Sequence, residues 1–568
     1  MGGSRAVGMA VGIVFASWVC ANAAGQEFRR LPVQEYRDKM KAGWIGQMAG
    51  VGWGGPTEFK FKGEIIPEDK MPNWEPKRIN QFTQDDIYVE MTFVRSMEQY
   101  GLDVSIRQAG IDFANSGFPL WHANAAGRDN LRKGIAPPDC SHPQFNKHAD
   151  DIDYQIDADY SGLVAPGLPN MAIALGEKFG RLMNYGDGLY GGQFIGGMIA
   201  EAFFETKPEK IVQAGLKCIP EGSQYAECIR DVLQWFKENP DNWEKTWQLV
   251  ERKYNDNPDY RKFSCRQGES NIDAKINGAY VVMGLLYGKS DLDKSIVIAC
   301  RCGQDSDCNP ANTGGVLFAS VGFSHLPERF KSALDESQTF SHTPYTFPKL
   351  IEACEKIARE VVVKSGGRIE KDASGEEVFV IPVQPIKPGK LEQCWEPGPI
   401  ANSEFTEEEM KQIKPPVSKK GGGSEANVSE AVEKFAPGWS VAKCGTPENP
   451  GLRDEFGGKK NVLVTHPLNR ETGCVLSKKI EVPAGKKTTL RLVVGHDPRG
   501  DWTLIARADG KEIFKKSVGK DTAEKGWMNV DVDLSDFAGN TIALELVNQP
   551  SGWTFEAAYW AKIAIESE

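Results

Sequence analysis

The spacing of apolar residues changes once along this 568-residue chain, and the change limits what the chain can fold into. Between about residue 33 and residue 364, apolar residues recur every three or four positions, the period of an α-helix. The clearest helical segments are 36–40, 87–100, 168–179, 190–204, 223–237, 271–287 and 349–363. From residue 376 onward, apolar and polar residues alternate, as in β-strands. The sequence therefore predicts an all-α domain over residues 33–365, followed by an all-β domain.

A stretch rich in Pro, Gly, Lys and Glu separates the two patterns, over residues 366–425. This composition favours an extended or flexible linker, and the alternation at 376–383 adds a candidate β-hairpin within it. Beyond the linker, the alternating runs 488–494, 502–507 and 542–547 are separated by clusters of turn-forming residues. Such spacing is expected of a β-sandwich, here over residues 426–568.

The C-terminal domain carries aromatic residues that allow two interpretations. Trp502, Trp527, Trp553 and Trp560 lie in or beside its predicted strands. Aromatic rings can stack on sugar rings, but tryptophan is also a common core residue of β-sandwiches. The region resembles the galactose-binding-like jelly-roll modules that are appended to secreted enzymes acting on glycans. That resemblance implies carbohydrate binding, with core packing as the alternative for each ring.

Composition and charge exclude several classes of protein. The chain has 40% hydrophobic and 26% charged residues, and its mean hydropathy of −0.41 leaves no room for several membrane spans. A formal net charge of −11 argues against a nucleic-acid partner, because phosphate binding requires clustered Lys and Arg. These values fit a cation-binding protein or one with a neutral ligand, and they leave the oligomeric state open.

The N-terminus has the layout of a secretory signal peptide, predicted over residues 1–23. Arg5 precedes an apolar run at 7–19, and the small residues 21–23 form a candidate cleavage site. Export to the periplasm or the cell exterior is therefore expected; a buried N-terminal helix and a lipoprotein anchor at Cys20 are the alternatives. Twelve cysteines less Cys20 leave eleven, so at least one thiol stays unpaired. Candidate disulfide pairs are Cys444 with Cys474 and Cys218 with Cys228.

Two acidic motifs, at residues 83–87 (TQDDI) and 303–308 (GQDSDC), lie about 220 residues apart. Carboxylates gathered at one point need a cation between them, and oxygen ligands without nearby His or Cys pairs favour Mg²⁺, Ca²⁺ or Mn²⁺ over zinc. Each motif alone has an ordinary explanation, since Asp pairs cap helices and GxDxD stretches form turns. A third element, the glycine-rich segment 43–58 that ends in Glu58, strengthens the case for one shared site.

These three segments, in this order, resemble the ADP-ribosylglycohydrolase superfamily over roughly residues 33–365. The resemblance implies an all-α fold that holds one or two divalent ions in a cleft. By the same resemblance, the metal-site residues are Glu58, Asp85, Asp86, Asp305 and Asp307. Gln84 stands where the family has a Thr ligand and is counted with the metal residues, whereas Cys308 replaces the Thr after the last Asp. Glu58 and Asp86 are also candidates for the catalytic base.

An acidic stretch, residues 151–167, occupies the place of the family's phosphate-binding loop. Carboxylates repel phosphate, at a cost of a few kcal/mol per pair at an effective dielectric of about 20. An uncharged substrate is therefore expected, with Asp153 accepting hydrogen bonds from sugar hydroxyls. Asp157 and Asp159 are candidates for the acid or base of glycosidic cleavage. The alternative is an exposed acidic loop without a ligand.

A glycine-rich turn at 184–192 precedes the helical segment 190–204 and is expected to line the same cleft. Asp187 is a candidate sugar ligand there, or alternatively a turn former. Tyr185 and Tyr190 are candidates for stacking on a sugar face.

Together these features favour a secreted, metal-dependent hydrolase of glycosidic bonds in a neutral glycan or glycoside. One alternative is an ADP-ribosyl hydrolase that releases ADP-ribose from a modified target. The other is a non-catalytic carbohydrate-binding protein, in which the missing Thr ligands would mark the loss of activity.

Overall fold

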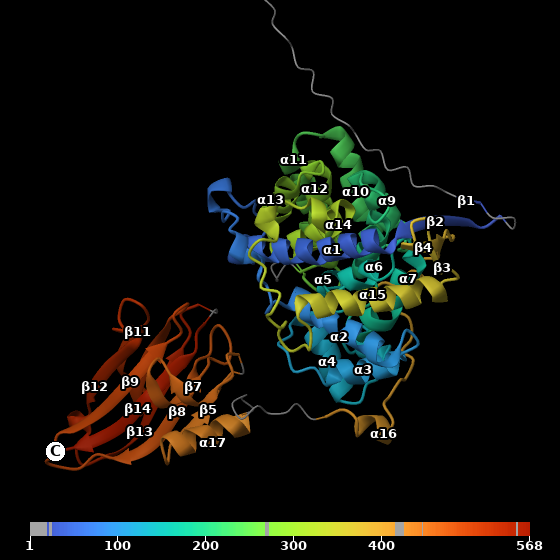
Figure 1. The fold of residues 1–568 in the computed structure, drawn as a ribbon. Helices are drawn as coiled ribbons and strands as arrows, with labels where there is room; N and C mark the ends of the chain where they lie inside the picture. Colours follow the sequence, from blue (N-terminus) through green and yellow to red (C-terminus); the bar gives the residue numbers. More distant parts are fainter. Residues whose placement is uncertain (1–19, 22–24, 267–271, 415–424, 446, 553–554) are drawn as a thin grey trace, which may run out of the picture. The chain divides into compact units, whose positions relative to one another are not determined.

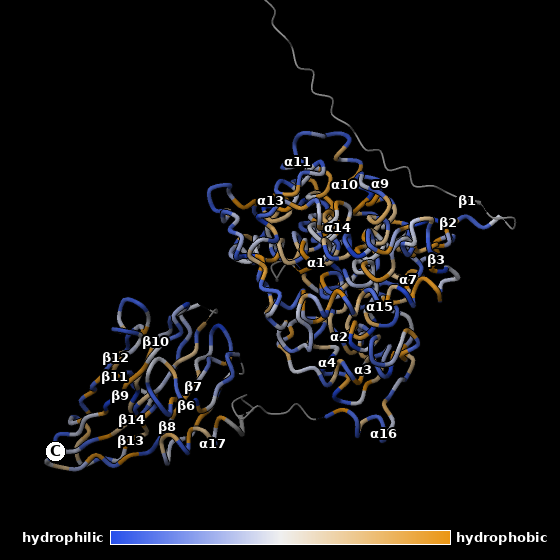
Figure 2. The backbone as a smooth tube through the Cα atoms, in the orientation of Figure 1, coloured by the Kyte–Doolittle hydropathy of each residue, from blue (hydrophilic) through white to orange (hydrophobic). Residues whose placement is uncertain are grey.

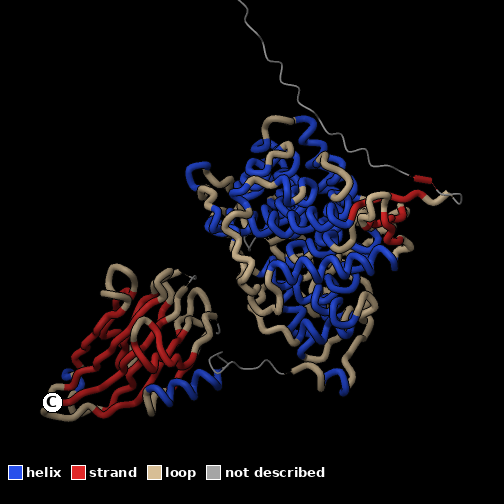
Figure 3. Tube along the Cα trace, viewed as in Figure 1, coloured by secondary structure: helices blue, strands red, loops and turns tan. Residues whose placement is uncertain are grey.

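The computed structural model describes residues 20–21, 25–266, 272–414, 425–445, 447–552 and 555–568. The chain divides into two compact units, residues 1–416 and residues 417–568. Unit 1 is mostly helical and unit 2 is built from antiparallel β-sheets, as the sequence predicts (Figure 3). Most of the predicted signal peptide and Trp553 lie outside the described residues. Among the described residues, no helix combines the length and the apolarity needed to cross a membrane.

The helices of unit 1 span the following bounds (Figure 1): α1 (Val33–Gly54), α2 (Asp85–Tyr100), α3 (Ile106–Ala114), α4 (His122–Arg132), α5 (Asp153–Ile156), α6 (Asp159–Leu163), α7 (Pro169–Phe179), α8 (Asp187–Ala202), α9 (Pro208–Leu216), α10 (Gln224–Glu238), α11 (Trp243–Val250), α12 (Ala274–Gly288), α13 (Leu292–Arg301), α14 (Cys308–Val321), α15 (Phe347–Lys364) and α16 (Glu407–Met410). The centre of unit 1 is formed by α1, α8, α12 and α14, most of whose residues are buried. The glycine-rich segment lies at the end of α1, and the second acidic motif leads into α14.

Glycines allow α1 and α14 to pack backbone against backbone. A Cβ atom on Gly46 would overlap the carbonyl oxygen of Gly314, and one on Gly50 would overlap that of Pro310. At the end of α1, a Cβ on Gly54 would overlap the carbonyl oxygen of Ser306, inside the second acidic motif. The glycine-rich segment therefore lies against the second acidic motif, because only glycine permits two backbones to approach this closely.

Replacing Gly46 by Ala is expected to lower the free energy of unfolding of unit 1 by about 3 kcal/mol. The added methyl group must push apart two backbones in a filled core, and overpacking of this kind costs about 1–3 kcal/mol or more. Gly55→Ala is the matched control, because its Cβ would meet nothing within 4 Å. Thermal unfolding of both variants provides the measurement, and an unchanged melting temperature for Gly46→Ala would contradict the close packing.

A small antiparallel sheet ties the end of the helical domain to its beginning. Its strands are β1 (Cys20–Ala21), β2 (Glu27–Pro32), β3 (Arg368–Lys371) and β4 (Glu377–Pro382), in the order β1-β2-β4-β3. Strands β3 and β4 form a hairpin, and Arg30 of β2 pairs with Val380 of β4. The stretch for which the sequence predicts a linker, 366–425, thus contributes a hairpin and α16 to unit 1.

Unit 2 is a pair of five-stranded antiparallel sheets, in the orders β11-β10-β13-β8-β5 and β12-β9-β14-β7-β6. Its elements are α17 (Glu425–Phe435), β5 (Ser440–Ala442), β6 (Gly451–Phe456), β7 (Lys459–Thr465), β8 (Cys474–Glu481), β9 (Thr488–His496), β10 (Trp502–Ala508), β11 (Lys511–Val518), β12 (Trp527–Asp533), β13 (Thr541–Gln549) and β14 (Ala558–Ser567). Alternate residues of β9 and β13 are buried, and these strands show interleaved apolar and polar colours in Figure 2. This alternation gives each sheet one apolar face for the core.

Two of the tryptophans that the sequence offered as sugar-stacking residues are core residues. Trp502 and Trp560 are fully buried, with ring centroids 5.4 Å apart. Their indole nitrogens donate to the carbonyl of Gly495 and to the hydroxyl of Thr465, each at 2.9 Å. Trp527 is only half-buried and stays available as a contact residue.

The two candidate disulfide pairs differ in the structure. Neither pair is joined by a disulfide in the structure, and Cys218 and Cys228 are both buried. The side chains of Cys444 and Cys474 form a hydrogen bond with each other. This contact supports Cys444 and Cys474, and not Cys218 and Cys228, as a pair that could form a disulfide in an oxidising compartment.

Candidate functional site

Carboxylates from three distant segments meet at one place in unit 1. Ligand atoms of Asp86, Asp307 and Cys308 lie within 4.8 Å of one another, and so do those of Glu58, Asp305 and Asp307. Asp307 belongs to both groups and connects them. Together with Asp85, the residues Glu58, Asp86, Asp305 and Asp307 form what we name the carboxylate cluster. The five metal-site residues implied by the family resemblance are thus brought together.

Short contacts between the end of α1 and the segment before α14 hold the cluster together. The Thr57 hydroxyl lies 2.9 Å from that of Ser306. The amide of Phe59 donates to the carbonyl of Gln304, and the amide of Gln304 donates to the carbonyl of Phe61. Glu58 stands between these contacts, so the backbone on either side of it is fixed to the second acidic motif.

The two acidic motifs each begin a helix, and both helix N-termini lie at the cluster. Asp85 and Asp86 are the first two residues of α2, and Asp307 directly precedes α14. The positive end of a helix dipole favours negative charge. Capping does not explain these residues, because α2 has Gln84 at its N-cap with no side-chain cap bond, and α14 has Asp307 there with none. Gln84 is half-buried beside the cluster.

Burial and mutual repulsion make the cluster hard to ionise without a counter-ion. Burial, then the charge of Glu58, raises the pKa of Asp305 to about 8. Partial removal from solvent, then the charges of Asp307 and Asp85, raises the pKa of Glu58 to about 8. The pKa values of Asp86 and Asp307 are also raised well above their usual range, first by burial and then by neighbouring Asp charges. A bound cation would remove this penalty.

Buried oxygen atoms without partners suit a hard cation. Among the described residues, neither carboxylate oxygen of Asp86 has a hydrogen-bond partner, and the same holds for Oδ1 of Asp305. Unsatisfied buried oxygens are costly, and cations such as Mg²⁺ and Ca²⁺ bind oxygen ligands. The residues present therefore fit a divalent cation.

Asp157 is a further buried carboxylate close to the carboxylate cluster. It follows α5, is fully buried, and has two oxygens without partners among the described residues. Burial, then the charge of Asp85 as the largest of several neighbouring charges, raises its pKa well above the usual range. Asp153, four residues earlier, accepts a hydrogen bond from the amide of Asn124 through Oδ1, while its Oδ2 has no partner. Both residues therefore keep acceptor oxygens available for a ligand.

Asp159 has a different environment from Asp157. Both of its oxygens accept hydrogen bonds from the side-chain amide of Asn312, at 3.0 and 3.3 Å. Burial raises the pKa of Asp159 and of Glu90 well above the usual range, and the charge of Asp159 raises that of Glu90 further. Glu90 accepts from the side chain of Gln47 and from the amide of Tyr160. This pair sits in a network of hydrogen bonds that positions α1, α2 and α6.

Glu90 is a residue of the site region that sequence reasoning missed. A signal was available, because Glu90 lies four residues after Asp86 and therefore on the same face of α2. Gln47 connects the two, since its side-chain nitrogen donates to the Glu90 carboxylate and to the Asp86 carbonyl.

The predicted sugar-stacking tyrosines are held by another part of the chain. The hydroxyl of Tyr190 donates to the carbonyl of Lys390 at 2.8 Å and accepts from the amide of Glu392. The hydroxyl of Tyr185 accepts from the amide of Gly398 at 3.1 Å. Both residues are buried, so the segment 390–398 covers the rings that were expected to face a sugar.

Asp187, the third candidate in this turn, joins a buried charge network. Its Oδ1 accepts from the amide of Tyr225 at 3.2 Å. Burial raises the pKa of Asp187 to about 6, against the lowering effect of the Lys275 charge. Lys275 is itself buried and forms an ion pair with Asp273 at 2.6 Å. Asp187 therefore contacts the start of α10 within the electrostatic influence of Lys275, and its Oδ2 remains without a partner among the described residues.

Comparison with known proteins shows which family the helical unit resembles. The ADP-ribosylglycohydrolase family model matches residues 32–365. Among solved structures, one described as an ADP-ribosylglycohydrolase-related protein complex is 14% identical, with a TM-score of 0.36, over 58% of this chain and 99% of that one. A family 35 carbohydrate-binding module from Clostridium thermocellum is 8% identical, with a TM-score of 0.17, over 23% of this chain and 92% of that one.

A search of curated proteins found no match to the sequence. The family model nevertheless covers more than half of the chain and includes every residue of the carboxylate cluster. The chain belongs to the ADP-ribosylglycohydrolase family.

Proposed function

We propose that this protein is an exported, divalent-cation-dependent hydrolase that cleaves a glycosidic bond in a neutral glycan or glycoside. Its family is one of glycosidic-bond hydrolases. The observation that carries the proposal is the set of buried carboxylate oxygens on Asp86, Asp157 and Asp305 that have no partner in the described part of the chain. Such a set suits a cation and sugar hydroxyls, both of which bind to acceptor oxygens.

Asp85, Asp86, Asp305 and Asp307 would hold the ion, with Gln304 and Gln84 beside them. When bound, the ion polarises an oxygen atom of the substrate or lowers the pKa of a water molecule. Glu58 is exposed at the edge of the cluster, where it can take a proton from the attacking water as general base. Asp157, with its raised pKa and free oxygens, suits the general acid that protonates the leaving oxygen.

The charge around the cluster favours a neutral substrate. A phosphate placed about 4 Å from one of these carboxylates, without a cation between, would cost about 4 kcal/mol at an effective dielectric of 20. Nearby positive groups are partly committed elsewhere: the amine of Lys60 donates to the carbonyl of Pro56, and the guanidinium of Arg128 donates to the carbonyls of Ser116 and Phe118. A sugar without phosphate avoids this repulsion.

Release of ADP-ribose from a modified target is the second candidate function. Burial raises the pKa of Glu58 and the charge of Lys60 opposes that rise, while the amine of Lys62 lies 5.3 Å from the ring centroid of Phe59, the next residue, so two positive charges lie at the edge of the site. These lysines are the specific observation in favour of a pyrophosphate group. Lys60→Ala and Lys62→Ala should weaken binding of ADP-ribose and should leave a neutral glycoside unaffected.

The test is incubation of the purified protein with a panel of neutral glycosides and with an ADP-ribosylated peptide, with and without EDTA. Hydrolysis of a neutral glycoside that EDTA abolishes and Mg²⁺ or Ca²⁺ restores is the expected result. Release of ADP-ribose alone would favour the second candidate function. Binding of glycans without any hydrolysis would identify a non-catalytic protein, and EDTA-resistant turnover would contradict the role of the ion.

A further inference from the structure

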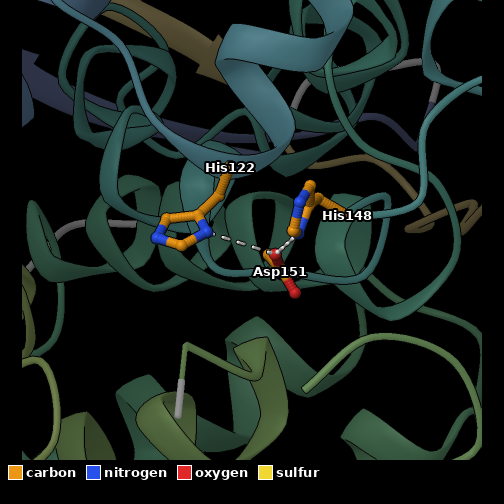
Figure 4. A group of neighbouring side chains, drawn as sticks. All are labelled: His122, His148 and Asp151. Atoms are coloured by element: carbon orange, nitrogen blue, oxygen red, sulfur yellow. Dashed lines mark hydrogen bonds and ion pairs between the residues drawn. The ribbon is translucent and has the colours of Figure 1, made fainter. Parts of the chain in front are cut away.

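Two histidines and an aspartate meet outside the carboxylate cluster, as Figure 4 shows. Asp151 lies between the rings of His122 and His148, and its Oδ2 is 2.8 Å from Nδ1 of His148 and 4.0 Å from Nδ1 of His122. The ring centroids of the histidines are 5.4 Å apart. One ligand atom from each of the three residues lies within 4.8 Å of the others. We name this group the histidine cluster.

Asp151 is fixed so that one oxygen faces the histidines. Its Oδ1 accepts hydrogen bonds from the hydroxyl of Ser264 and, at 3.4 Å, from the thiol of Cys265. Its backbone carbonyl accepts from the side chain of Asn184 at 2.8 Å. The side chain of Asp151 is completely buried. Outer partners that orient a ligating carboxylate in this way are a regular feature of metal sites.

The two histidines reach the aspartate from separate segments. His122 is the first residue of α4, and its backbone has a φ of 42°, in the left-handed region that non-glycine residues rarely adopt. The amide of His148 donates to the side-chain oxygen of Asn146, which is buried. Among the described residues, the ring of His122 has no hydrogen-bond partner, although it faces Asp151. The His122 ring is therefore available as a ligand.

We infer that His122, His148 and Asp151 form a second metal site, which binds a divalent transition-metal ion of the zinc class. Imidazole nitrogens favour zinc, copper, nickel and iron, whereas the all-oxygen carboxylate cluster favours Mg²⁺ or Ca²⁺. Three protein ligands leave a fourth position for water or a ligand, as in reactive zinc sites. The histidine side chains are 34% and 31% exposed, so solvent reaches that position. The inference does not rest on the proposed function.

The charge of the surroundings agrees with a bound cation. Asp151 is flanked by two further buried carboxylates, Asp150 and Asp153, and the Ser264 hydroxyl lies against both Asp150 and Asp151. A divalent ion at Asp151 would offset this accumulation of negative charge. Because zinc ligands must be deprotonated, zinc binding requires both imidazoles to be neutral, and the affinity should increase as pH rises.

The test is equilibrium dialysis of the full-length protein against Zn²⁺, in buffer with excess Mg²⁺ to occupy the carboxylate cluster. One Zn²⁺ per chain is expected, and His122→Ala or His148→Ala should each weaken binding at least about tenfold. Co²⁺ in place of Zn²⁺ should give a visible absorption spectrum that the double variant loses. His325→Ala is the matched control, because this exposed histidine lies outside the cluster and bonds to Ser324.

A second control separates the two metal sites. Asp307→Asn alters the carboxylate cluster and should leave Zn²⁺ binding unchanged. Loss of Zn²⁺ in Asp307→Asn, or full Zn²⁺ binding by the double histidine variant, would overturn the inference. Because both histidines are partly exposed, the single variants should fold, and circular dichroism without metal verifies this. The readout is metal binding without substrate, so failure of the proposed function would not affect it.

Discussion

Replacing Asp307 by Asn should reduce hydrolysis by about 1,000-fold or more and should abolish binding of Mg²⁺ or Ca²⁺ at the carboxylate cluster. Asp307 belongs to both groups of candidate ligand atoms, one with Asp86 and Cys308 and one with Glu58 and Asp305. A divalent ion contributes several kcal/mol to stabilising charge in a transition state, and each 1.36 kcal/mol is worth about tenfold in rate. Losing the central ligand removes most of that contribution.

Glu58→Gln is a second variant for the same experiment, and its expected result differs from that of Asp307→Asn. Glu58 is exposed at the edge of the cluster, so its loss should weaken cation binding less than the loss of Asp307. Removal of a general base typically costs about 100- to 10,000-fold in rate. We therefore expect Glu58→Gln to retain an ion and lose turnover, whereas Asp307→Asn loses both.

The measurement is the rate on the best glycoside of the panel, together with cation binding by calorimetry. Asp69→Asn is the control, because Asp69 is exposed and forms an ion pair with its neighbour Lys70. Asp307→Asn should fold, since it removes one charge from a crowded buried set. Retained activity with retained dependence on the cation would contradict the placement of the ion at Asp307.

The cluster residues were predictable from sequence because each lies in a short motif with a local physical reason. Glycines at 46, 50 and 54 permit the approach of two backbones, and that approach carries Glu58 to Asp305 and Asp307. The fold class was predictable because the spacing of apolar residues along the chain indicates whether a segment is a helix or a strand. The fold class follows from this local pattern alone, whereas the meeting of the motifs in space was expected from their resemblance to the ADP-ribosylglycohydrolase superfamily.

The parts that sequence reasoning misplaced depend on long-range contacts. Tyr185 and Tyr190 are covered by a segment about 200 residues later, which lies inside the predicted linker. Strand β4 finds its partner in β2, before the first helix, so hydrophobic alternation revealed the strand and not its place in the sheet. Nor does sequence decide burial for single residues such as Trp502. Composition showed that the linker is rich in Pro and Gly, and packing then determined where it lies.

The metal-free protein should lose stability as pH rises, and bound cation should suppress that loss. A carboxyl whose pKa is higher in the folded state than in the unfolded state binds more protons when folded, so the free energy of unfolding falls as pH increases between the two values. For Asp305 these are about 4 when unfolded and about 8 when folded. One pKa unit corresponds to about 1.4 kcal/mol, so this fully buried residue alone is worth a few kcal/mol.

Thermal unfolding followed by far-ultraviolet circular dichroism, which reports mainly the helices of unit 1, measures the effect between pH 5 and pH 9. In EDTA the melting temperature should fall across this range, and saturating Mg²⁺ should reduce the fall, because the ion binds the ionised carboxylates of the folded state only. Asp305→Asn should flatten the profile in EDTA, whereas the exposed Asp69→Asn should not. A melting temperature in EDTA that is constant or rises with pH would show that these carboxyls ionise freely in the folded protein, and the cluster would then have no need of a cation.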